Sequence, residues 1–332
     1  MFRNRLFAAL AGIVIIVSAC GATASPSAPP SSPPASTADA SATSSMAPAP
    51  SVATPAPSTP SSVSAATLGE ILFCSNRGRT DGLDGIYVMH ADGSTVRLLS
   101  NTLGATDWMP TFSPDGTKIA FASNRFADLM AIYLMNPDGS GQTRITDNTF
   151  SSYRPSWSPD GKHIVYASFE TGELFVMNAD GSLQTRLTAG PSGHPSWSPS
   201  GKVIAFGGQE GANSVSEINV VNVDGSGRRQ LTHHGQMNNK PSWSPDGTRI
   251  AFESKRGGNT DIYVMNADGT GERRLTTDAA VDEWPAWSPD GGSIAFTHAV
   301  SPSKPEIDVM KADGSGQTSV TKGQEAWCPS WR

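Results

Sequence analysis

The heptapeptide Pro241-Ser242-Trp243-Ser244-Pro245-Asp246-Gly247 decides the fold of this chain. Within it, a proline at the second turn position presets φ and Gly247 is free to take a positive φ, so Ser-Pro-Asp-Gly forms a tight hairpin turn. We therefore expect one short strand at Pro241–Trp243 and an antiparallel partner at Ile250–Ser254. The flanking sequence thus specifies a β-hairpin.

A second hairpin follows directly. Residues Asp261–Met265 are expected to form a third strand, and Asn266-Ala267-Asp268-Gly269 is a further Asp-Gly turn. Arg274–Thr276 then supplies a fourth short strand. Residues 241–276 are therefore expected to form one four-stranded antiparallel sheet.

This unit recurs along residues 67–332. An aromatic residue precedes the Ser-Pro-Asp-Gly turn, or a variant of it, at intervals of 40 to 46 residues, and a last tryptophan closes the chain without its turn. These aromatic residues are Phe112, Trp157, Trp197, Trp243, Trp287 and Trp331. A period of that length with four strands in each repeat indicates propeller blades, in which repeated aromatic residues pack between neighbours. We predict an all-β fold, a six-bladed β-propeller of four-stranded blades.

The first blade lacks a strand of its own before its hairpin. Its remaining strands are expected at Ile71–Ser75, Ile86–Met89 and Arg97–Leu99, while Pro329–Arg332 has no strand after it. The C-terminal strand is therefore predicted to complete the first blade, which closes the ring and removes a pair of open sheet edges.

The repeat resembles a known family. Pro-Ser-Trp-Ser-Pro-Asp-Gly, Ile-Ala-Phe, Ile-Tyr-Val-Met-Asn-Ala-Asp-Gly and Arg-Leu-Thr, all within residues 241–276, are similar to the TolB-like propeller, a Pro-Asp-type repeat also found in tricorn protease and many secreted bacterial proteins. The resemblance covers residues 67–332. It implies a platform that binds proteins or ligands, or in some cases an accessory domain of a hydrolase.

The N-terminus has the pattern of a targeting signal. Arg3 and Arg5 precede an uncharged apolar stretch, Leu6–Ala19, which is shorter than the roughly 20 residues that span a bilayer. Val17-Ser18-Ala19-Cys20 resembles a bacterial lipobox. We predict a lipoprotein signal peptide at 1–19 and lipidation of Cys20, which would give a stable membrane anchor outside the cytoplasm, in the periplasm or at the cell surface. The alternative is an ordinary secretory signal with an unrelated cysteine.

Residues 20–66 are predicted to be a disordered linker after the lipidated cysteine. From residue 21 onward all but four are Gly, Ala, Ser, Thr or Pro; the exceptions are Asp39, Met46, Val52 and Val63. Such a segment cannot bury enough apolar surface to offset the entropy of ordering it.

Two cysteines remain in the propeller. Cys74 lies in the second strand of blade 1 and Cys328 at the start of the C-terminal strand, on neighbouring positions of one hairpin. Such positions lie within bridging distance, so we predict a Cys74–Cys328 disulfide that locks the two ends of the propeller. The alternative is a pair of buried free thiols.

The residues one or two positions before the proline of each blade's first strand differ from blade to blade. We expect an aromatic arc to face a polar and basic arc at one mouth of the channel, and this mouth to bind a ligand or partner. The alternative is that the rings cap the channel or pack under loops. The predicted binding residues are Trp108, Tyr153, Arg154, His194, Lys240, Glu283, Trp284 and Trp327.

Composition and motifs restrict the function classes that this chain can belong to. A net charge of −6 argues against nucleic acid as a partner. The six histidines form no metalloprotease motif and no Gly-x-Ser-x-Gly elbow occurs, so we expect no catalytic residue, metal or cofactor. The prediction is a membrane-anchored monomer that binds an envelope protein, peptide or glycan without catalysis. The alternative is a secreted enzyme, a polysaccharide lyase or hydrolase, which requires histidines and carboxylates to converge in the channel.

Overall fold

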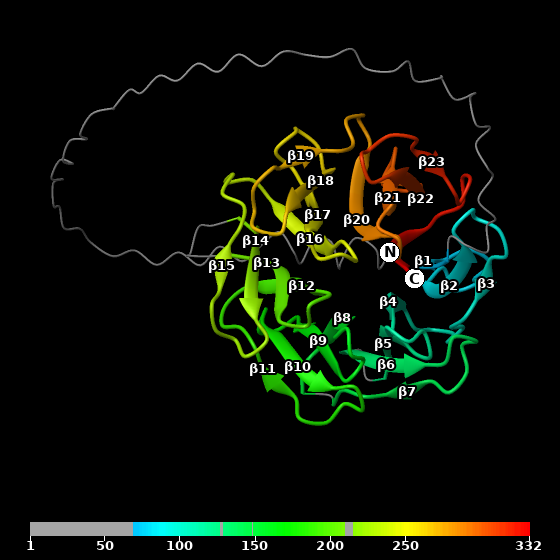
Figure 1. The fold of residues 1–332 in the computed structure, drawn as a ribbon. Coiled ribbons are helices and arrows are strands. Elements are labelled where there is room, and N and C mark those ends of the chain that lie inside the picture. Colours follow the sequence, from blue (N-terminus) through cyan, green and yellow to red (C-terminus); the bar gives the residue numbers. More distant parts are fainter. Residues whose placement is uncertain (1–68, 127–128, 148, 210–214) are drawn as a thin grey trace, which may run out of the picture. The chain divides into compact units, whose positions relative to one another are not determined.

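The computed structural model describes residues 69–126, 129–147, 149–209 and 215–332, and these form six four-stranded antiparallel sheets (Figure 1). The signal peptide 1–19, the lipidation site Cys20 and the linker predicted at 20–66 lie outside the described residues. Among the residues described, no helix is long and apolar enough to cross a bilayer.

The first three blades, with each strand given from the channel outward, run as follows. Blade 1 comprises β24 (Trp327–Trp331), β1 (Glu70–Ser75), β2 (Gly85–His90) and β3 (Arg97–Leu98). Blade 2 comprises β4 (Asp107–Phe112), β5 (Ile119–Phe126), β6 (Leu129–Met135) and β7 (Thr143–Arg144). Blade 3 comprises β8 (Ser152–Trp157), β9 (His163–Ser168), β10 (Leu174–Asn178) and β11 (Thr185–Arg186).

The other three blades have the same order. Blade 4 comprises β12 (Ser192–Trp197), β13 (Val203–Gly208), β14 (Glu217–Asn222) and β15 (Arg229–Gln230). Blade 5 comprises β16 (Asn238–Trp243), β17 (Arg249–Ser254), β18 (Asp261–Asn266) and β19 (Arg273–Arg274). Blade 6 comprises β20 (Val281–Trp287), β21 (Ser293–Ala299), β22 (Pro305–Lys311) and β23 (Thr318–Ser319).

The predicted six-bladed propeller is confirmed, and so is its closure by the C-terminal strand. β24 pairs with β1 through Ile71 and Trp331, and through Leu72 and Ser330. The inner strands of consecutive blades contact each other around the whole ring, with β20 against β24 and β24 against β4 (Figure 1). Closure leaves the propeller without an open first or last blade.

A disulfide reinforces this closure. Cys74 of β1 and Cys328 of β24 are joined, with their Cα atoms 5.8 Å apart and a sequence separation of 254. Arg332 adds an ion pair, 2.5 Å from its Nη2 to Oε2 of Glu70. Both contacts connect the end of the chain to the first strand of the propeller.

The hydrophobic core lies between blades rather than at the centre of the ring. The second strand of each blade is buried on both faces; in blade 5, Ile250, Ala251 and Phe252 are fully buried. Phe252 packs with Ile218 of blade 4 in one of these inter-blade clusters. Trp287 also donates a hydrogen bond from Nε1 to the Ser242 carbonyl of the preceding blade at 3.1 Å. The repeated tryptophans therefore pack between neighbouring blades, as their repetition predicts.

The Ser-Pro-Asp-Gly turns form as their residues require. In blade 5 the Gly247 amide donates to the Ser244 carbonyl at 2.8 Å, with Gly247 at φ 69°. The Ser244 hydroxyl donates to Asp246 Oδ1 at 2.5 Å. This hydroxyl and the Thr248 amide and hydroxyl lower the pKa of the Asp246 carboxyl to about 2. The turn aspartate thus serves the turn itself.

Candidate functional site

Each inner strand carries a β-bulge directly before its proline. In all six blades the register with the second strand shifts at this point, where three steps along the inner strand oppose two along its partner. The bulged residues all have a left-handed φ between 50° and 60°, which is uncommon for residues other than glycine. A bulge re-aims the side chain that it carries. We call this set the bulge ring: Met109, Arg154, His194, Lys240, Trp284 and Cys328.

A cavity of about 850 Å³ occupies the channel. Its inner end is lined by the bulge ring and its walls by the prolines that follow and by Ser156, Ser196, Ser242 and Ser330. Its outer rim includes the turn 113–116. None of its lining residues comes from the described loops that lead into the inner strands or join the second and third strands. The cavity therefore belongs to the side of the Ser-Pro-Asp-Gly turns, not to the mouth expected from the sequence.

Trp284 lies across the inner end of this cavity. The Lys240 ammonium is 4.2 Å and the Arg154 guanidinium carbon 5.6 Å from its ring centroid. The His194 ring meets it edge-on at 5.2 Å. These four residues come from blades 3, 4, 5 and 6, and blades 3 and 6 are opposite each other in a ring of six. Their contacts therefore span the channel and form a layer of side chains across it.

Lys240 connects this layer to two carboxylates. Its Nζ lies 2.8 Å from Oε2 of Glu253, which is buried in β17, and 3.1 Å from Oε2 of Glu283. Burial raises the pKa of the Glu253 carboxyl to about 7, although Lys240 favours its ionised form. The protonation of this group therefore changes near neutral pH.

Arg154 has no carboxylate partner within the described residues. Its Nη1 lies 2.8 Å from Nδ1 of His194, while Nε of Arg154 and Nε2 of His194 are buried without a hydrogen-bond partner. Burial lowers the pKa of Arg154 to about 10. Burial, together with the charges of Arg154 and Lys240, holds the pKa of His194 well below its usual value. The inner end of the cavity thus offers a guanidinium and a neutral imidazole with unused hydrogen-bonding capacity.

The structure divides the eight predicted binding residues into two groups. Arg154, His194, Lys240 and Trp284 directly precede the proline and line the cavity. The other four stand one position earlier and do not line it: Trp108, Tyr153, Glu283 and Trp327.

The second group packs toward the loops and neighbouring blades. Trp108 donates from Nε1 to Asp84 of blade 1 at 2.5 Å, and Tyr153 meets Phe169 edge-on at 6.2 Å. The predicted aromatic arc is therefore not a single surface. The sequence interpretation also missed Met109 and Glu253. The common offset of one residue before each proline was the signal that could have separated the two groups.

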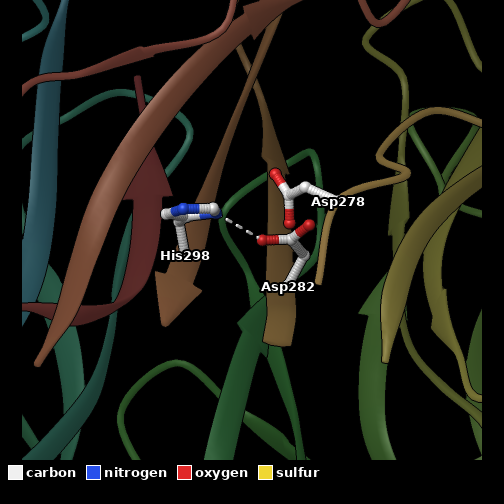
Figure 2. Close-up of side chains that lie close together, drawn as sticks. All are labelled: Asp278, Asp282 and His298. Carbon is white, nitrogen blue, oxygen red and sulfur yellow. Dashed lines mark hydrogen bonds and ion pairs between the residues drawn. The ribbon is translucent and has the colours of Figure 1, made fainter. Parts of the chain in front are cut away.

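A histidine and two aspartates meet in blade 6, apart from the cavity lining (Figure 2). His298 Nδ1 is 2.8 Å from Oδ1 of Asp282, and each of these residues and Asp278 offers one ligand atom within 4.8 Å of the others. Burial raises the pKa of the Asp282 carboxyl to about 6. Among the residues described, no other group of three histidine, cysteine or acidic side chains is this close. The enzyme hypothesis requires histidines and carboxylates to converge in the channel. This cluster lies outside the cavity lining, whereas in the channel Glu253 and Glu283 both contact Lys240.

The repeat and the ring agree with a known family model. The TolB β-propeller domain matches residues 70–236 and 155–332, which together span the whole propeller. The chain belongs to the TolB β-propeller family. The crystal structure of TolB from Acinetobacter baumannii superposes with a TM-score of 0.69 at 22% identity, covering 79% of this chain and 66% of that one. The predicted TolB-like repeat is confirmed, and at this identity the superposition shows the fold alone.

Two curated relatives match shorter stretches. The uncharacterized protein Atu1656 of Agrobacterium fabrum is 31% identical over 109 residues, 32% of this chain and 36% of that protein. The uncharacterized peptidase YuxL of Bacillus subtilis is 37% identical over 82 residues, 24% of this chain and 12% of that protein. The chain thus matches about a third or less of the length of these relatives.

Proposed function

We propose that this protein is a non-catalytic binding platform outside the cytoplasm, anchored to a membrane through lipidated Cys20. Its channel cavity would hold a peptide segment of a partner envelope protein. The proposed binding site comprises the four predicted residues that line the cavity, namely Arg154, His194, Lys240 and Trp284. The bound segment would enter the cavity from the side of the Ser-Pro-Asp-Gly turns.

The observation that carries the proposal is the unpaired Arg154 at the inner end of the cavity. Glu253 and Glu283 favour the charge of Arg154 only from beyond contact distance, and its buried Nε has no hydrogen-bond partner within the described residues, so a carboxylate from a bound segment would add charge-assisted hydrogen bonds that the folded chain does not supply. The cavity volume of about 850 Å³ is within the usual range for a ligand site. We therefore infer that the bound segment carries an acidic side chain or its own C-terminal carboxylate.

A peptide fits this site better than a glycan. Sugars bind through the open faces of aromatic rings, but Lys240 and Arg154 lie over Trp284. Trp243 and Trp287 also line the cavity, yet both are packed into clusters between the blades. The serine hydroxyls and backbone groups of the wall suit the amides of an extended chain instead.

Site-directed photo-cross-linking in intact cells tests this proposal. A benzophenone amino acid at Pro114, in the exposed turn at the outer rim of the cavity, should capture one predominant envelope protein. The same probe at Thr185, on the exposed outer strand of blade 3, is the matched control and should not capture it. Arg154→Gln should reduce the Pro114 product severalfold. Equal products from both positions, or a product indifferent to Arg154→Gln, would contradict the proposed site.

A further inference from the structure

Blade 6 departs from the repeat at the end of its second strand. The residue two positions after the strand phenylalanine or tyrosine is serine in blades 1, 2, 3 and 5, namely Ser75, Ser123, Ser168 and Ser254, but it is His298 in blade 6. Two residues further on, Val300 is exposed where blades 1, 2 and 5 have an arginine. Blade 6 has therefore exchanged a serine and an arginine for a histidine and a valine.

The change affects Asp282, the aspartate that His298 contacts. In blade 2 the fully buried Asp107 occupies the place of Asp282, and Arg125 pairs with it at 2.8 Å. In blade 6 Asp282 is also fully buried, but within the described residues its ion-pair partner is His298 and not an arginine or lysine. A buried carboxylate normally requires a cationic partner, so blade 6 has replaced the permanently charged guanidinium of blade 2 with an imidazole, which can also bind a metal ion when it is neutral.

A second aspartate lies beside the first. Figure 2 shows the carboxylate of Asp278, from the loop before β20, facing that of Asp282. The Asp282 carboxyl interacts with His298 through Oδ1 and with the Thr276 side chain, while Oδ2 is buried and meets no donor in hydrogen-bond geometry within the described residues. Two carboxylates and an imidazole thus converge around a buried oxygen.

We propose that Asp278, Asp282 and His298 form a binding site for a divalent transition-metal ion of the zinc class. This site goes beyond the proposed peptide binding and does not depend on it. The ion would supply the positive charge that Arg125 supplies to Asp107 in blade 2, and it would give Asp282 Oδ2 a partner.

The ligand set suits this class of ion. Zinc lies about 2.0–2.2 Å from histidine nitrogen and carboxylate oxygen, so two of its ligands are about 3.4 Å apart at a tetrahedral angle. The Nδ1 of His298 and Oδ1 of Asp282 are 2.8 Å apart, a hydrogen-bond separation, so binding an ion requires these two atoms to move apart by about 0.6 Å. Asp278 is exposed and offers an oxygen within 4.8 Å of both. An imidazole ligand favours zinc, cobalt or nickel over calcium and magnesium, and three protein ligands leave a position for water.

Isothermal titration of the purified, tag-free chain with ZnCl₂ tests the site. One ion should bind per chain, and CoCl₂ should give visible absorption bands of a bound ion. Asp278→Asn changes an exposed ligand, and His298→Ser restores the residue of four other blades, so both variants should keep the fold. Each should weaken zinc binding at least tenfold.

His234→Ser is the matched control, because His234 contacts Glu272 at 2.8 Å on blades 4 and 5, far along the chain from blade 6. It should bind zinc as the unaltered chain does. The proposal is overturned if no zinc binds at 1 mM, if Asp278→Asn and His298→Ser both leave stoichiometric binding unchanged, or if His234→Ser abolishes it. Denaturant midpoints of the three variants verify that each is folded.

Discussion

The Trp284 ring and the Arg154 guanidinium lie 5.6 Å apart although their blades stand opposite each other in the ring. Both residues reach the channel axis because a left-handed bulge turns each side chain inward. With Lys240 and His194 they close the inner end of the cavity. A cross-channel contact of this kind couples the stability of the ring to the structure of the candidate site.

Trp284→Ala should open the layer of side chains that Trp284, Arg154, Lys240 and His194 form across the channel. The variant loses cation–π contacts to Lys240 and Arg154 and the packing of a half-buried ring, which together stabilise the fold by about 2–3 kcal/mol. Urea denaturation should show this loss. Water should also reach Glu253, so its pKa should fall toward the ordinary value, as measured by carboxyl ¹³C NMR. Trp108→Ala, whose ring contacts Asp84 outside the cavity lining, is the control and should leave the pKa of Glu253 unchanged.

Stability should depend on pH through Glu253. Burial raises its pKa in the folded state to about 7, against an ordinary value of 4.5. Between these two values the folded chain holds a proton that the unfolded chain has lost, so stability from this group is full below pH 4.5 and declines as pH rises to about 7. The decline is on the order of 3 kcal/mol.

Glu253→Gln checks this dependence. The amide resembles the protonated acid and does not titrate, so the difference in unfolding free energy between the variant and the unaltered chain should change in favour of the variant from pH 5 to pH 8. Urea titrations at four pH values measure this difference. A difference that stays constant over the whole range would show that Glu253 does not titrate there.

The sequence predicted the fold because the fold depends on local turn chemistry repeated six times. Gly247 and its equivalents define the hairpins, and the missing strand before Ile71 indicates the ring closure. The bulge ring could not be predicted in the same way. Its left-handed φ falls on residues as different as Met109 and Lys240, neither of which favours that conformation on its own. The position directly before each proline marks the bulge ring in the sequence, but only the bulge explains why neighbours such as Glu283 and Trp284 belong to different surfaces.

Reduction of the Cys74–Cys328 disulfide should weaken the ring at its closure. The disulfide joins residues 254 apart, and its loss can lower the unfolding free energy by up to about 5 kcal/mol by releasing the unfolded chain. We expect the urea midpoint to fall on adding a reductant, and Cys74→Ser/Cys328→Ser to show the lower midpoint with and without it. Alkylation of Cys74 and Cys328 in the native, unreduced protein would contradict the bond.

Filling the cavity should block partner binding without unfolding the propeller. Ser242 lines the wall, is half-buried and lies on an inner strand, so the side chain in Ser242→Trp can project into a space of about 850 Å³. Because that space already exists, we expect the unfolding free energy to change by no more than about 1 kcal/mol, less than the usual cost of overpacking a filled core. Cross-linking of the partner in intact cells from the probe at Pro114 should fall at least tenfold. Thr185→Trp adds the same ring to the exposed outer strand of blade 3 and should leave the cross-link unchanged. Retention of the cross-link in a folded Ser242→Trp protein would show that the partner binds elsewhere on the propeller.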